Sequence, residues 1–211
     1  MHFVGIDLSG PSNTTDTAVA VFKHVDRSIH YERHIAAATD AQIRTAVADL
    51  AGTSPTVVGI DAPLSYNPGG GDRKADTELR RRLIDIGLPS GTVMAPTMTR
   101  MAYLTLRGVV LSRDLAALRG VRVMEVHPGG VCALRGAPIE AVRRFSCEPA
   151  ARVDLLHWME RLGVVGMRAD APSSHLVAAC AAALAAWKWA GGEAVWSARA
   201  SPPEMPFDFA C

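Results

Sequence analysis

Cysteine is scarce in this chain of 211 residues, which contains only four of them. Cys132, Cys147, Cys180 and Cys211 form no Cys-x-x-Cys pair, so their spacing predicts neither a zinc site nor a disulfide framework. The longest apolar run, residues 176–187, is too short to span a bilayer, which needs about 20 residues. The amino terminus lacks a charged and then apolar leader. We therefore expect a reduced, cytoplasmic protein that has no membrane partner.

The chain also lacks a strong charge of either sign. Its formal net charge of +1 excludes a strongly basic nucleic-acid coat protein, but it leaves room for an enzyme with a local basic track. Lysine occurs only at Lys23, Lys74 and Lys188, so arginine supplies most of the positive charge. Arginine forms bidentate contacts with phosphate, although an arginine-rich genome explains the same bias. A hydrophobic content of 49% predicts one globular domain over residues 1–211.

Five predicted elements follow one another in the first part of the chain. Residues 3–8 predict a buried strand, and residues 17–24 and 28–35 predict two more strands of an antiparallel meander. Residues 39–52 have a capping residue, helical apolar spacing and a closing glycine, which predict a helix. Residues 56–61 predict a strand in the middle of a sheet. This order opens the ribonuclease-H-like fold, an α/β fold whose mixed sheet has three antiparallel strands and then parallel strands, although the actin and sugar-kinase fold opens in the same way.

The remainder of the chain adds helices around that sheet. Residues 68–119 contain a glycine-rich loop and two helical segments, which we interpret as a helical insertion over the active edge of the sheet. Residues 121–128 predict the last clear strand, and residues 148–163 predict an amphipathic helix. Residues 173–190 predict a helix that is apolar on nearly all sides and therefore buried. The tail predicts a short strand, a turn and an edge segment.

Three of the predicted strands end in a carboxylate: Asp7, Asp61 and Glu125. Burying an unpaired carboxylate is costly, so three of them at matching strand ends suggest a shared partner. Oxygen-only ligands select Mg²⁺ or Mn²⁺, and two such ions about 4 Å apart serve phosphodiester hydrolysis. Each acid also has an alternative role, because Asp7 and Asp61 could begin a turn and Glu125 could pair with an internal arginine.

The motifs resemble those of the domain of unknown function 429 family, which are predicted nucleases of the ribonuclease-H-like fold. Arg73, Asp76 and Arg80 occupy the family's Arg-x-x-Asp-x-x-x-Arg positions, and His127 occupies the aromatic position of a Glu-Val-Tyr-Pro motif. The matching stretches in chain order are GIDLSG, GIDAPLS, DRKADTELRRRLIDIGLPSGTVMAPT, MEVHP and the tail after Gly192. The resemblance therefore covers essentially the whole chain.

This resemblance implies a nuclease that depends on Mg²⁺ or Mn²⁺ and has DNA or RNA as its partner. Asp7, Asp61 and Glu125 would be catalytic and would hold the metal. The residues expected to contact the substrate are Ser9, Arg73 and Arg80. The resemblance implies no particular oligomeric state.

One position departs from the family pattern. The family carries an aspartate in its last helix, in a pattern like His-x-x-Asp-Ala, and here Ala178 stands in its place, with His175 in the histidine position. Three explanations stay open: Asp170 completes the metal site, His175 acts as a catalytic ligand or general base, or the protein binds nucleic acid or a nucleotide without cleaving it. A fourth reading, an actin-like phosphotransferase, is disfavoured because 211 residues supply only one of the two lobes that clamp a nucleotide.

Overall fold

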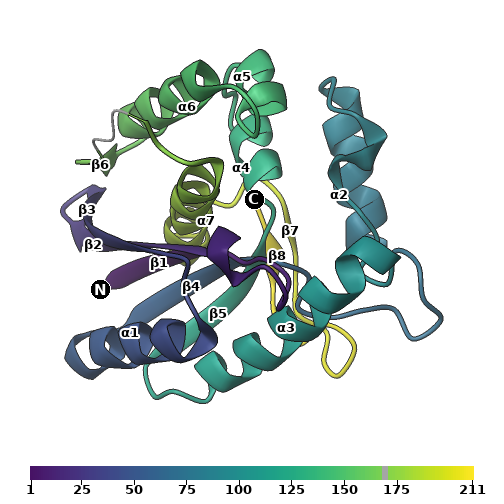
Figure 1. The fold of residues 1–211 in the computed structure, drawn as a ribbon, viewed down its shortest axis with the longest axis horizontal. Helices are drawn as coiled ribbons and strands as arrows, with labels where there is room; N and C mark the ends of the chain where they lie inside the picture. The colour runs from purple at the N-terminus through teal and green to yellow at the C-terminus, as the bar shows by residue number, and fades with distance from the viewer. Residues whose placement is uncertain (168–170) are drawn as a thin grey trace.

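The computed structural model describes residues 1–167 and 171–211. Within them, one mixed sheet has the strand order β6-β3-β2-β1-β4-β5-β8-β7 (Figure 1). Strands β1, β2 and β3 form an antiparallel meander, and β4 and β5 continue the sheet parallel to β1. The strands are β1 (His2–Asp7), β2 (Ala18–Val25), β3 (Ser28–Ala36), β4 (Thr56–Asp61), β5 (Val121–Val126), β6 (Val164–Val165), β7 (Ser197–Ala198) and β8 (Phe209–Ala210). The predicted ribonuclease-H-like α/β fold is confirmed.

Helices cover both faces of the sheet. One apolar core packs α4, α5, α6 and α7 against one face, and a second core packs α1 and α3 against the other (Figure 1). The helices are α1 (Asp40–Thr53), α2 (Lys74–Asp85), α3 (Thr99–Ala116), α4 (Pro128–Leu134), α5 (Ile139–Arg144), α6 (Pro149–Arg161) and α7 (Ser174–Ala190), with 3-10 turns η1 (Thr14–Asp16) and η2 (Ser90–Thr92). In the part of the chain that the structure describes, no helix meets the length and hydropathy needed to cross a membrane.

The alanine-rich helix α7 lies directly on the middle of the sheet, as its apolar sequence predicts. Its approach depends on two glycines, because a Cβ at Gly5 of β1 would overlap the carbonyl oxygen of Ala179. A Cβ at Gly59 of β4 would lie 2.6 Å from the carbonyl oxygen of Ala182, which is also too close. The Val-Gly-Ile-Asp sequence shared by β1 and β4 therefore places a small residue under α7 and an acid at the strand end.

Several elements differ from the sequence prediction or were missed by it. Helices α4 and α5 and strand β6 were not predicted, since two to seven residues give little periodic signal. The final segment of the tail is not an edge, because β8 pairs in parallel with β5 and β7 forms the outer edge beyond it. Helices α2 and α3 confirm the two helical segments within residues 68–119.

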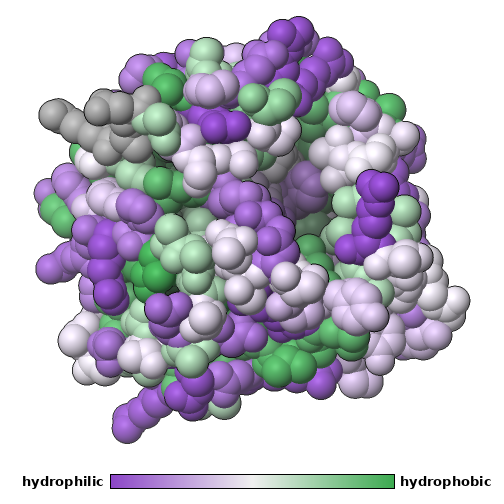
Figure 2. Space-filling model, viewed as in Figure 1, coloured by the Kyte–Doolittle hydropathy of each residue, from purple (hydrophilic) through white to green (hydrophobic). Residues whose placement is uncertain are grey.

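The exposed side of α3 carries three large apolar side chains. Tyr103, Leu106 and Val110 recur at helical spacing and are 67%, 59% and 69% exposed. Figure 2 shows an apolar patch at the lower centre of this view, over α3, within an otherwise mixed surface.

Candidate active site

Asp7 and Asp61 face each other at the carboxyl ends of two adjacent parallel strands. The pairing of β1 with β4 puts Asp7 directly in register with Asp61. Both side chains are half-buried and line a cavity of about 280 Å³. The same cavity is lined by Glu125 and Asp76, and by apolar side chains that include Met101. The structure thus brings together the three strand-end acids that the sequence singled out.

The two aspartates strongly affect each other's ionisation. Burial raises the pKa of Asp61 well above its usual value, and the neighbouring Asp7 carboxylate raises it further. Burial also raises the pKa of Asp7, although a hydrogen bond with His175 opposes that shift. Two carboxylates in one poorly hydrated site resist carrying two negative charges unless a cation joins them. Within the described residues, Asp61 forms no ion pair with a basic side chain.

Among the residues that the structure describes, His175 is the basic group in contact with this pair. It lies in the first turn of α7, whose N-cap Ser173 accepts a hydrogen bond from the Leu176 amide. Its Nδ1 lies 2.7 Å from Asp7 Oδ2, and its Nε2 lies 3.8 Å from Asp16 Oδ1. The hydrogen bond with Asp7 raises the pKa of His175. The imidazole is 41% exposed, so it can exchange a proton with solvent while it stays in contact with Asp7.

Glu125 lies in the same cavity but has a counter-ion of its own. Its two carboxylate oxygens accept hydrogen bonds from the two terminal nitrogens of Arg73, one of them at 2.7 Å, and Oε2 also accepts from the Leu64 amide at 2.8 Å. Glu125 is 3% exposed and Arg73 is 8% exposed. The alternative role of Glu125, pairing with an internal arginine, is therefore observed, and the arginine is Arg73. The assignment of Glu125 as a metal ligand stays a prediction. A metal ion there would compete with Arg73 and the Leu64 amide for the carboxylate oxygens.

The Arg-x-x-Asp part of the motif builds this ion cluster. Arg73 precedes α2, and its Nε and one terminal nitrogen donate to Asp76, at 3.0 and 2.6 Å. Asp76 also accepts from the Arg73 backbone amide at 2.8 Å, so the two residues cap the helix together. The remaining terminal nitrogen donates to Ser65 and Glu125. Burial disfavours the charged guanidinium, but the Glu125 and Asp76 carboxylates outweigh it and raise the pKa of Arg73.

The second arginine of the motif also has protein partners. Arg80 donates two hydrogen bonds of 2.6 Å to Asp72 and two more to the Val93 carbonyl oxygen. These contacts tie the glycine-rich loop to the segment after α2. For both motif arginines the predicted contact with substrate stays a prediction, because their observed hydrogen bonds are internal.

Comparison with known families fits this arrangement of motifs. A family model described as "Protein of unknown function (DUF429)" matches residues 5–204. The chain belongs to the DUF429 family. No curated protein and no solved structure matches the chain. The matched range begins within β1 and includes both the aspartate pair and the Arg73 cluster, while β8 lies beyond its end.

The loop after β1 in this DUF429 protein is fixed by a buried arginine of α3. Arg107 donates to the Ser9 carbonyl oxygen and to Thr17 Oγ1, each at 2.8 Å, and it pairs with Asp40 at the start of α1. Ser9 itself contacts Asn13 and Thr17 through its hydroxyl. In the sequence, the position of Arg107 in an apolar helix face is the signal that could have indicated this structural role.

His127, in the aromatic position of the DUF429 motif, caps a helix. Its Nδ1 accepts a hydrogen bond from the Gly130 amide at 2.8 Å, so Nε2 carries the proton and donates to the Thr92 carbonyl oxygen at 2.9 Å. Burial lowers the pKa of His127, which favours this neutral form. The tertiary structure thereby links the start of α4 to η2 beside the cavity.

The missing acid of the DUF429 pattern leaves a two-carboxylate centre. Ala178 is buried in α7, one turn after His175, and contributes no polar atom. Asp170, which the sequence offered as a replacement ligand, lies outside the described residues. Among residues 1–167 and 171–211, no group of three or more histidine, cysteine or acidic side chains is arranged to hold a metal ion. The metal assignment therefore depends on Asp7 and Asp61.

Proposed function

We propose that this DUF429 protein is a divalent-metal-dependent nuclease that hydrolyses phosphodiester bonds of DNA or RNA, with Mg²⁺ or Mn²⁺ held by Asp7 and Asp61. One observation carries the proposal: two half-buried carboxylates face each other in a cavity, and Asp61 has no basic partner in the described part of the chain. Two neighbouring carboxylates in such a site lower the stability of the fold, and a bound cation would offset this loss.

The donor set agrees with a hard cation. Mg²⁺ in phosphoryl-transfer sites typically uses one or two carboxylates and takes its other ligands from water and substrate phosphate. Asp7 and Asp61 supply those two carboxylates. Bound there, the ion would supply Lewis-acid polarisation of the phosphate and a water of lowered pKa.

The protein's own residues would position and protonate the substrate. The aspartates define the carboxyl edge of β1 and β4 as the place where the scissile phosphate must lie. Because the Asp7 carboxylate accepts the Nδ1 proton of His175, the neutral imidazole has a lone pair at Nε2 that can take up a proton, and Asp7 favours the imidazolium that results. In this proposal Glu125 orients Arg73 next to the cavity, since both carboxylate oxygens already accept hydrogen bonds from that guanidinium.

A catalytically inactive nucleic-acid or nucleotide-binding module is the second candidate. Ala178 favours it, because the buried alanine removes an oxygen ligand that the family pattern supplies. With fewer protein ligands, the site would bind metal more weakly and hold the phosphate less firmly.

The test is a cleavage assay with labelled single- and double-stranded DNA and RNA, in Mg²⁺, in Mn²⁺ and in a chelator. The variants are Asp7→Asn, Asp61→Asn and Ala178→Asp, and the control is Asp114→Asn on the exposed side of α3, where Asp114 pairs with Arg44. The proposal expects metal-dependent cleavage that falls at least about 100-fold in Asp7→Asn and Asp61→Asn. Cleavage only by Ala178→Asp would favour the inactive module. Equal activity in all variants, or none with any metal, would overturn the nuclease proposal.

A further inference from the structure

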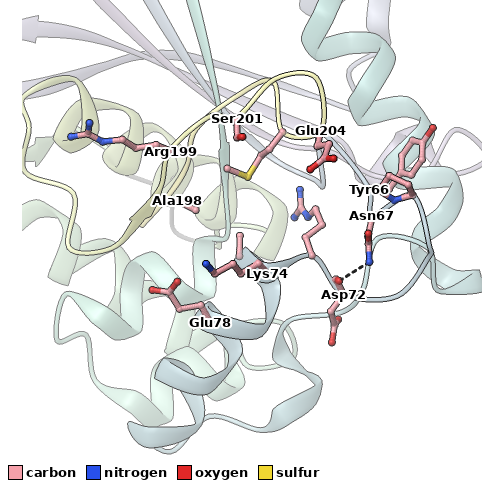
Figure 3. Close-up of a pocket in the computed structure, with 13 residues that line it drawn as sticks. Tyr66, Asn67, Asp72, Lys74, Glu78, Ala198, Arg199, Ser201 and Glu204 are labelled. Atoms are coloured by element: carbon pink, nitrogen blue, oxygen red, sulfur yellow. Dashed lines mark hydrogen bonds between the residues drawn. The ribbon is translucent and has the colours of Figure 1, made fainter.

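A second cavity of about 570 Å³ lies next to the acid-lined one, and Arg73 lines both. Its walls come from two stretches that are distant in sequence: the loop 66–72 with the start of α2 that follows it, and the tail around residues 198–205 (Figure 3). Its volume falls in the range of pockets that hold small ligands. A ligand group in this cavity would therefore neighbour any phosphate placed at Asp7 and Asp61.

Half of the charged groups that line this second cavity already have protein partners. Asp72 accepts two hydrogen bonds from Arg80, and Glu78 accepts one from the Trp196 indole at 2.9 Å. Arg73 is neutralised by the acids of its cluster.

The remaining charged groups are two cations and one acid. Lys74 and Arg199 are exposed, and neither forms a hydrogen bond or ion pair through its side chain with another described residue. Glu204 is likewise exposed and has no basic partner in the described chain. The cavity thus offers two available positive charges, which suit phosphate oxygens.

The other side of the cavity carries side chains that can contact a nucleic-acid base. Tyr66 is 53% exposed, although tyrosine usually buries much of its ring. Figure 3 shows Tyr66, Asn67 and Glu204 on one side of the cavity, with Lys74 and Arg199 on the other. An aromatic face can stack on a base, and carboxylate and amide oxygens can accept hydrogen bonds from the edge of a base that is not in a duplex. The Asn67 Oδ1 is the available atom of that side chain, because its Nδ2 donates to the Gly70 and Asp72 carbonyl oxygens.

We propose that this cavity binds the nucleotide adjacent to the scissile phosphodiester of a single-stranded nucleic acid. Lys74 and Arg199 contact its phosphates, and Tyr66 stacks on its base, with Asn67 and Glu204 at the base edge. A duplex does not fit this arrangement, because its bases are stacked on one another and their pairing edges are occupied. The inference rests on the proposed function. It adds that the substrate is single-stranded and that its strand runs from the aspartate pair into this second cavity.

The test measures binding of fluorescent single strands of DNA and RNA, and of duplexes of the same length, by anisotropy in Ca²⁺ over a range of salt concentrations. The variants are Tyr66→Ala and the double variant Lys74→Ala with Arg199→Ala. The matched control is Lys23→Ala with Arg119→Ala, two exposed cations that line neither cavity. All the substituted side chains are exposed, so the fold should survive each change.

Two results are expected. Tyr66→Ala should weaken single-strand binding about 5- to 100-fold and leave the weaker duplex binding unchanged. The Lys74 and Arg199 double variant should lower the slope of log K against log salt by about 1.4, whereas the control should change it by much less.

The two proposals fail in different ways. If wild-type protein cleaves but Tyr66 and the two cations do not affect binding, the cavity proposal is overturned and the nuclease proposal stands. If binding depends on these residues but no metal supports cleavage, the cavity proposal stands and the nuclease proposal fails. Equal loss of duplex and single-strand binding in Tyr66→Ala, or no binding of any strand, would also overturn the cavity proposal.

Discussion

Two pairs of acids line one cavity, and they differ in their burial and in their counter-ion. Asp76 and Glu125 share the Arg73 guanidinium, which donates hydrogen bonds to both carboxylates. Within residues 1–167 and 171–211, Asp7 and Asp61 share no arginine or lysine, and the basic side chain in contact with the pair is the imidazole of His175. The first pair is also the more buried one, with Asp76 1% and Glu125 3% exposed, whereas Asp7 and Asp61 are half-buried. The first pair has its counter-ion within the protein, whereas the second pair has none among the arginine and lysine side chains that the structure describes.

This difference has energetic consequences of opposite sign. Removing one partner from a buried, hydrogen-bonded ion cluster leaves an uncompensated charge, which is strongly destabilising. Removing one of two facing carboxylates relieves repulsion and desolvation. The comparison therefore predicts that chemically identical substitutions in the two pairs will change stability in opposite directions.

The largest expected effect is at Glu125. Glu125→Ala should lower the free energy of unfolding by about 3–5 kcal/mol, because Arg73 keeps its charge in a site that is 8% exposed. Urea unfolding followed by circular dichroism measures this loss. Glu140→Ala is the control, since exposed Glu140 pairs with Arg143 and should cost no more than about 1 kcal/mol. Similar small losses in both variants would show that the Arg73 cluster does not stabilise the fold.

The next effect separates Asp61 from Asp76. With a chelator present at about pH 8, Asp61→Asn should raise the free energy of unfolding by about 1–3 kcal/mol, because it removes a half-buried charge that has no basic partner among the described residues. Asp76→Asn should lower it under the same conditions, because Arg73 then loses one of its two carboxylate partners. Added Mn²⁺ should stabilise wild-type protein more than Asp61→Asn. A change of the same sign in both variants would remove the distinction between the pairs.

The smallest effect concerns the half-exposed pair of Asp72 and Arg80. Hydrogen bonds from Arg80 lower the pKa of Asp72, so the pair stabilises the fold above the ordinary aspartate pKa and loses this contribution as the pH falls through the lowered value. Asp72→Asn should therefore cost up to about 1 kcal/mol near pH 7 and less near pH 3. Urea unfolding at both values checks the sign. A cost that grows as the pH falls would contradict it.

The aspartate pair was accessible from sequence, whereas the ion cluster was not. Asp7 and Asp61 end two apolar strands of the same Val-Gly-Ile-Asp pattern, and parallel neighbours end at one edge of a sheet. The pairing of Arg73 with Glu125 spans 52 residues and joins the start of a helix to a central strand. No local pattern encodes such a contact, so the sequence left open whether Glu125 binds metal or an arginine.

The succession of three strands, a helix and a strand in the first 61 residues followed from the sequence alone, because apolar periodicity and turn residues are local properties. The capping residue expected at the start of α1 is Thr39, whose side chain accepts a hydrogen bond from the Gln42 amide. The tertiary structure determined where the shortest strands form. Strands β6 and β8 contain two residues each, and they form by pairing with β3 and β5 respectively. Tertiary structure also decided which acids carry a counter-ion, because the free energy of a buried charge depends on the groups that folding brings within hydrogen-bonding distance.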